Sequence, residues 1–86
     1  MMNVCVVSTF EGTTEDYMNM FNSTKESAQG FMVDYELGVI REGKVMLMMN
    51  ITDMNKMQEV MGSEEMKAWD EKFNCVDVIY ALDQMN

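Results

Sequence analysis

The stretch that decides the fold is FMVDYELGVIREGKVMLMMNIT, residues 31–52. Its apolar residues alternate with other residues on both sides of a glycine, a pattern typical of a β-hairpin. We predict strands over residues 31–39 and 44–51, joined by a three-residue loop in which Gly43 is left-handed. A register shifted by one residue would mix apolar and acidic side chains on each face, so burial selects one pairing. That pairing places Val39 opposite Val45, Leu37 opposite Leu47, Tyr35 opposite Met49 and Val33 opposite Ile51.

Upstream of the hairpin, the sequence predicts one strand and one helix. The β-branched run within residues 3–10 is typical of a strand, and it ends at Glu11-Gly12. Thr13 then starts a helix, with Asp16 completing a shortened capping box, and Gly30 ends the helical region. The apolar face of this helix carries five residues at helical spacing, namely Tyr17, Met20, Phe21, Thr24 and Ala28.

Downstream, the sequence predicts two short helices and a last strand. Asp53 caps a helix that Gly62 ends, and Ser63 caps a second helix that ends near Asn74. The inner face of the second helix carries Met66, Trp69 and Phe73. Residues 76–82 alternate again and predict a fourth strand. The predicted order is therefore βαββ(αα)β.

This order predicts an α+β ferredoxin-like fold in one domain, residues 1–86. Right-handed crossovers give a four-stranded antiparallel sheet with strand order 4-1-3-2 and helices on one face. We expect the helices to cover Val33, Tyr35, Leu37, Val45, Leu47, Met49, Val76, Val78, Tyr80 and Leu82. The other face would then carry Met32, Asp34, Glu36, Ile40, Met46, Met48, Asn50, Asp77, Ile79 and Ala81, with either Cys5 and Val7 or Val4 and Val6.

The face without helices is too apolar for a solvent-exposed face of a sheet, because Met46 and Met48 lie at the centre of their strand. Monomers seldom expose an apolar patch of several hundred Å². A domain of this size also gains much from additional burial. We therefore expect the chain to be its own partner, in a homodimer whose two sheets face each other and form an α/β barrel.

Charge and composition exclude several function classes. A net charge of −9 and a pI near 4.1 argue against nucleic acid and anionic membranes as partners. The absence of histidine removes imidazole bases and histidine-ligated haem or zinc, and we expect no cofactor. Cys5 and Cys75 form no metal-binding spacing, so we expect buried thiols and no metal. Without a long apolar run or a secretory signal, a cytoplasmic location is expected.

Two groups of residues could be metal sites, but each has a simpler structural interpretation. Three methionines in the 53–62 helix, or three in the strand over 44–51, resemble thioether clusters for Cu(I), but their spacing favours packing. Asp34, Glu36 and Asp77 could form a carboxylate cluster with a raised pKa or bind a hard cation. Charges on an edge strand more often prevent aggregation. The methionines in question are Met54, Met57 and Met61, and Met46, Met48 and Met49.

The element order and the segment Ser63-Glu64-Glu65-Met66-Lys67-Ala68-Trp69-Asp70 resemble the dimeric α/β-barrel superfamily, which includes antibiotic-biosynthesis-monooxygenase-like and stress-responsive barrel proteins. The resemblance covers the whole chain. It implies a fold shared by cofactor-independent monooxygenases, haem-degrading enzymes, small isomerases and proteins without assigned activity. Haem-degrading relatives carry a histidine near the end of this helix, where this sequence has Asp70, so the resemblance does not extend to haem.

Three functions follow as hypotheses. The first is a non-catalytic protein that binds a small apolar ligand in a methionine-lined pocket. The second is a cofactor-independent monooxygenase or isomerase acting on an aromatic or polyketide-like substrate. The third is a structural or interaction module that uses the edge of the second strand. Candidate ligand-binding residues for the first two are Tyr35, Met46, Met48, Asn50, Trp69 and Asp70. Packing in the core is the simpler role for Trp69.

Overall fold

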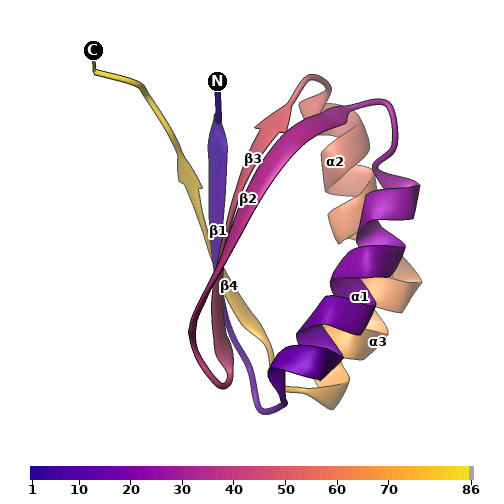
Figure 1. Cartoon of the computed structure of the whole chain (residues 1–86). Coiled ribbons are helices and arrows are strands. Elements are labelled where there is room, and N and C mark those ends of the chain that lie inside the picture. Colours follow the sequence, from indigo (N-terminus) through magenta and orange to yellow (C-terminus); the bar gives the residue numbers. More distant parts are fainter. Residues whose placement is uncertain (86) are drawn as a thin grey trace.

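Four strands form one antiparallel sheet, and three helices cover one of its faces (Figure 1). The computed structural model describes residues 1–85. The sheet order β2-β3-β1-β4 confirms the predicted ferredoxin-like topology. The elements are β1 (Val4–Thr9), α1 (Thr14–Ser27), β2 (Met32–Arg41), β3 (Lys44–Ile51), α2 (Met54–Met61), α3 (Glu64–Lys72) and β4 (Val76–Ala81).

All three helices begin at the capping residues predicted from the sequence. The Thr13 hydroxyl accepts a hydrogen bond from the Asp16 amide at 3.1 Å, and the Asp16 carboxylate accepts one from the Thr13 amide at 2.9 Å. Asp53 and Ser63 accept hydrogen bonds from the amide three residues on in α2 and α3. These side chains satisfy amides that a helix start leaves unpaired, so the local sequence fixes where each helix begins.

The β2–β3 hairpin has the predicted register over its central part, where Tyr35, Leu37 and Val39 pair as expected. The prediction that Val33 pairs with Ile51 is wrong, because Met32 pairs with Ile51 and the register shifts between Met32 and Asp34. A second shift lies beside the turn, where Arg41 pairs with Lys44. The turn itself needs Gly43, whose φ is +83° and where a Cβ would come within 2.7 Å of the Phe10 carbonyl oxygen.

The register of β1 decides which residues face the helices, because directly opposed residues share a face. Val6 pairs with Leu47 on one side and with Ile79 on the other. Val4, Val6 and Ser8 therefore face the helices, and Cys5 and Val7 lie on the uncovered face, which we call the open face.

The predicted face of β4 is wrong by one residue. Asp77 pairs with Ser8 and lies on the helix side together with Ile79 and Ala81. The apolar series Val76, Val78 and Tyr80 lies on the open face instead. The hydroxyl of Ser8 donates to the Asp77 carboxylate at 2.6 Å. The alternation of apolar residues does not show which face of an edge strand the helices cover. Here the helices cover the face that carries Asp77, although the opposite face of β4 is the more apolar one.

The core lies between the sheet and the helices, where Phe21, Val45 and Met49 are almost fully buried. Phe10 and Tyr17 stack with ring centroids 5.5 Å apart, and Trp69 and Phe73 extend this aromatic group. The aromatic group fills one end of the interface between sheet and helices. Sulfur-containing side chains fill much of the rest.

Candidate functional site

A small cavity lies between the helix-covered face of the sheet and the three helices. The centre of a water molecule can move within about 20 Å³ of it, which is room for about one water. Its lining is mostly apolar and includes a few polar side chains. The lining residues are Val6, Ser8, Tyr17, Met20, Phe21, Thr24, Leu47, Met49, Met57, Met61, Met66, Asp70, Cys75 and Asp77.

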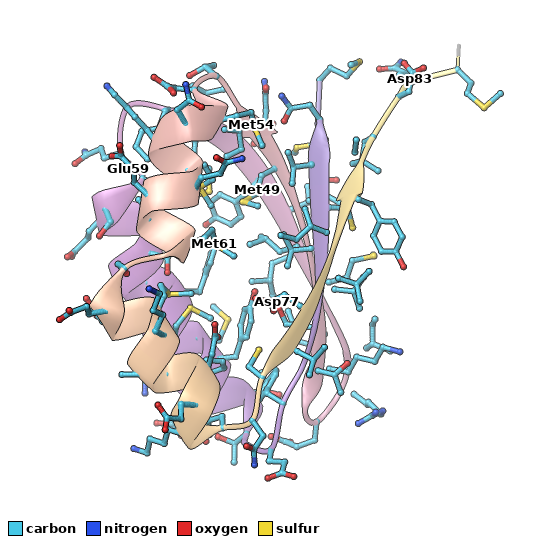
Figure 2. The ribbon with its side chains drawn as sticks, turned by 180° about the vertical axis from the view of Figure 1, so that it is seen from behind. Met49, Met54, Glu59, Met61, Asp77 and Asp83 are labelled. Carbon is cyan, nitrogen blue, oxygen red and sulfur yellow. The ribbon has the colours of Figure 1, made fainter. Side chains whose placement is uncertain are left out.

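Five methionines from four elements line this cavity: Met20 of α1, Met49 of β3, Met57 and Met61 of α2, and Met66 of α3. The Thr24 hydroxyl lies 3.4 Å from the Met20 sulfur and 3.6 Å from the Met66 sulfur, so it holds two of them near each other. Met49 and Met61 lie in the layer between helices and sheet in Figure 2. Unbranched thioether side chains repack easily, which makes this lining adaptable.

The polar part of the lining consists of Ser8, Asp70, Cys75 and Asp77. The Cys75 thiol donates to Asp77 Oδ1 at 3.3 Å, and Ser8 donates to the same oxygen. One atom each of Asp70, Cys75 and Asp77 lies within 4.8 Å of the others. Figure 2 shows Asp77 between the strands and the helices. Among residues 1–85, Asp70 Oδ1 is buried without a hydrogen-bond partner.

The turn after α3 explains why these groups converge. Asn74 adopts a left-handed conformation with φ of +48°, which asparagine tolerates better than most residues. The amide of Cys75 then donates to the carbonyl oxygen of Asp70 at 2.8 Å, closing the end of the helix. This turn brings the start of β4 back beside the last turn of α3.

Burial and mutual repulsion perturb these groups. Burial raises the pKa of Asp70, and the Asp77 carboxylate raises it further. Burial, followed by the two neighbouring carboxylates, raises the pKa of the Cys75 thiol far above its ordinary value. Burial likewise raises the pKa of Tyr17. At neutral pH, Cys75 and Tyr17 are therefore uncharged, and any negative charge in the cavity belongs to the carboxylates.

Of the six predicted ligand-binding residues, only Asp70 lines this cavity. Trp69 lies in the aromatic group, with its ring centroid 4.8 Å from Phe73 and 6.2 Å from Tyr17. Tyr35 lies on the helix side at the sheet edge, where its ring packs on Phe21 and its hydroxyl accepts from Lys25 at 3.4 Å. These positions leave Trp69 next to the cavity lining and Tyr35 at the rim of the core.

Met46, Met48 and Asn50 alternate with the buried residues of β3 and so lie on the open face. Within one chain, the sheet separates them from Tyr35, Trp69 and Asp70. The six residues therefore do not form one pocket in a single subunit. Ligand binding by these residues stays a prediction.

The two metal readings of the sequence do not correspond to clusters in the structure. Asp34 and Glu36 lie in edge strand β2, whereas Asp77 lies in the opposite edge strand β4. Met49 lies on the other face of the sheet from Met46 and Met48. Met57 is buried, but Met54 is 43% exposed at the start of α2. The close group of Asp70, Cys75 and Asp77 has no sequence spacing that would have suggested it.

Comparison with solved structures identifies the class of fold. No family model matches the sequence, and no curated protein sequence matches it significantly. Solved structures match over almost the whole chain, and they include antibiotic-biosynthesis-monooxygenase-like proteins. This chain therefore has the ferredoxin-like fold of those proteins, as the sequence resemblance implied.

The individual matches are distant in sequence. SnoaB, a cofactor-independent oxygenase from Streptomyces nogalater, is 13% identical with a TM-score of 0.62, covering 99% of this chain and 97% of its own. A protein described as an antibiotic biosynthesis monooxygenase is 10% identical, with a TM-score of 0.62 and coverages of 96% and 99%. A dimeric ferredoxin-like protein of unknown function from Thermobifida fusca is 12% identical, with a TM-score of 0.51 and coverages of 94% and 92%.

Among residues 1–85, none of the helices combines the length and the apolar character needed to cross a bilayer.

Proposed function

We propose that this protein is a homodimeric α/β barrel whose methionine-lined cavity binds a small apolar ligand. The observation that carries the proposal is the convergence of five methionines from α1, β3, α2 and α3 on one cavity between sheet and helices. Concave, mostly apolar sites with a few placed polar groups are the usual form of a small-molecule site. Ser8, Asp70, Cys75 and Asp77 supply the polar groups here.

A ligand larger than one water requires the lining to move. Methionine side chains have three rotatable bonds and no branch, so they change rotamer at low cost compared with leucine or phenylalanine. Met61 is the most suitable side chain for a test because it lines the cavity but is only partly buried. Met54 lies on the same helix, outside the lining, and is a matched control.

Replacing Met61 with alanine should open the cavity and favour a small aromatic hydrocarbon. Toluene should bind Met61→Ala about 10-fold more tightly than the wild-type chain, since the variant no longer needs to displace a side chain. Fluorescence of Trp69, the single tryptophan, and thermal unfolding with added toluene measure this. Met54→Ala should behave as wild type. An equal gain in both variants, or no gain in Met61→Ala, would contradict the proposed site.

The dimer part of the proposal is supported by the open face. Val78, Tyr80 and Met46 are exposed there at 46%, 52% and 37%. Val7 and Met48 lie beside them on the same face of β1 and β3. A second copy of the chain would cover this surface and form the barrel, and the Thermobifida fusca neighbour of the same fold is described as dimeric.

Two neighbouring residues of β4 test the dimer. Val78→Lys places a charge on the open face and should weaken dimerisation about 100-fold or more, because a lysine in an apolar interface loses its hydration. Ile79→Lys adds the same charge on the helix side, at a residue that is 61% exposed, and should leave the dimer intact. Sedimentation at micromolar concentration measures both. A monomeric wild-type chain would refute the dimer.

Methionine oxidation gives an independent measurement of the same surface. Peroxide should oxidise Met46 slowly in the wild-type dimer and rapidly in Val78→Lys. Met54, exposed on the helix layer, should oxidise at the same rate in both proteins.

A second candidate function is cofactor-independent oxygenation of an aromatic substrate, supported by the likeness to SnoaB. The same cavity would hold the substrate, and Asp70, one of the ionisable groups in its lining, would accept a hydrogen bond from a substrate hydroxyl. Oxygen consumption with a polycyclic phenol, compared between wild type and Asp70→Asn, tests it. No consumption above that of the phenol alone leaves ligand binding as the function.

A further inference from the structure

We propose that Asp70, Cys75 and Asp77 form a Zn²⁺ site at the polar side of the cavity, with a fourth coordination position open toward the methionines. The three residues belong to the lining of the same cavity, but metal binding by them does not require an apolar ligand. The juxtaposition that carries it is one thiol and two carboxylates from the end of α3 and the start of β4, whose nearest ligand atoms lie within 4.8 Å of one another.

Two of the three ligand atoms already have the separation expected in a tetrahedral site. Bond lengths of about 2.0–2.3 Å place neighbouring ligand atoms of such a site about 3.5 Å apart. The Cys75 sulfur and Asp77 Oδ1 already lie 3.3 Å apart. We expect side-chain rotation to draw in the third ligand atom, which lies at most 4.8 Å from the other two. The hydrogen bond from the Cys75 amide to the Asp70 carbonyl oxygen holds the backbones of these two residues together.

One carboxylate oxygen of Asp70 lacks a partner that a cation could supply. Asp70 Oδ1 is buried and, among residues 1–85, accepts no hydrogen bond. A buried carboxylate oxygen without a donor is costly, because it has lost its hydration. The Cys75 thiol only partly offsets this cost for the Asp70 carboxylate. The neighbouring Asp77 adds repulsion. A divalent cation at this point would satisfy the oxygen and neutralise both carboxylates.

The donor set selects the kind of metal. Thiolate ligands disfavour Mg²⁺ and Ca²⁺, which take oxygen ligands, whereas Zn²⁺ accepts cysteine sulfur and carboxylate oxygen together. Three protein ligands with a fourth position open to a cavity is the arrangement of zinc sites that hold a water or a substrate atom. Binding replaces the thiol proton: Cys75–SH and Zn²⁺ give the Zn–S bond and a released proton, so affinity should rise with pH.

Cobalt substitution tests the site on the reduced, chelator-treated full-length protein. Addition of Co²⁺ should give a thiolate-to-cobalt charge-transfer band that saturates at one equivalent per chain, and Zn²⁺ should abolish the band while Mg²⁺ should not. Cys75→Ser should remove the band. Cys5→Ala keeps it, since Cys5 lies on the open face, and it controls for any nonspecific thiol binding.

Matched aspartates test the carboxylates. Asp70→Asn and Asp77→Asn should each weaken Co²⁺ binding at least 10-fold, as loss of a charged ligand does, while Asp34→Asn at the opposite sheet edge should not. Circular dichroism verifies that each variant is folded. No saturable band in the wild type, or a band that survives Cys75→Ser, would overturn the site. Toluene binding by metal-free Met61→Ala is measured separately, so failure of either proposal leaves the other standing.

Discussion

The two faces of the sheet carry similar apolar side chains but differ in what covers them. Strand β3 shows this within one element: Val45, Leu47 and Met49 are buried under the helices, whereas Met46 on the other face is 37% exposed. Strand β4 shows the reverse, because its apolar series lies on the open face and its aspartate on the covered one. Hydrophobicity therefore does not by itself tell which face of this sheet is the core.

The largest predicted effect is a difference in the free energy of unfolding between substitutions on the covered face and on the open face. Met49→Ala should lower the free energy of unfolding by about 2–5 kcal/mol, because it removes a buried apolar side chain and enlarges the cavity that Met49 lines. Met46→Ala should lower the free energy of unfolding by less. If a second subunit covers the open face, the loss in Met46→Ala should depend on protein concentration and the loss in Met49→Ala should not. Denaturant unfolding at two protein concentrations measures both. Equal, concentration-independent losses would remove the distinction between the faces.

A smaller effect should come from the helix layer that covers one face. Thr13→Ala removes the capping hydroxyl of α1 and should destabilise the protein by about 1 kcal/mol. Thr14→Ala is a matched control, because Thr14 donates through its backbone amide, to the Glu42 carboxylate at 2.6 Å, and alanine keeps that amide. Thermal unfolding of the two variants should differ. Identical melting temperatures would mean that the predicted cap contributes nothing.

The smallest effect concerns the polar group on the covered face and depends on pH. Because the pKa of Asp70 is raised in the folded protein, the folded state holds this proton more tightly than the unfolded chain. Its ionisation therefore costs stability as pH rises above the ordinary value of 3.8. Asp70→Asn should be more stable than wild type at pH 7 in the absence of metal, with the difference vanishing below that value. A constant difference across pH would contradict this.

Local sequence signals predicted much of the fold. Thr13, Asp53 and Ser63 fix the helix starts through their own hydrogen bonds, and Gly43 fixes the turn, so each was visible in a few neighbouring residues. The sequence did not show which face of β4 the helices cover. It depends on pairing with β1, and on a hydrogen bond between Ser8 and Asp77, far apart in the chain.

The candidate site was largely missed for the same reason. Asp70 was predicted from the family resemblance, but Cys75 and Asp77 join it only through the left-handed turn at Asn74. A methionine-lined pocket was predicted, but with Met46 and Met48 of the strand as its candidate residues. Four of the five methionines that line the observed cavity come from helices instead. Ser8 offered a weak signal, as a polar residue inside a β-branched run.

The central place of β1 in the sheet has a consequence for how the chain folds. β1 is the first strand synthesised, yet both of its partners come later, and its contact with β4 joins residues 69 positions apart. The hairpin of β2 and β3 can form from its own short turn, whereas β1 must wait for β3 on one side and for β4 on the other. Such long-range pairing slows folding. During synthesis, Val4, Cys5 and Val6 should therefore stay accessible to chaperones longer than any other part of the sheet.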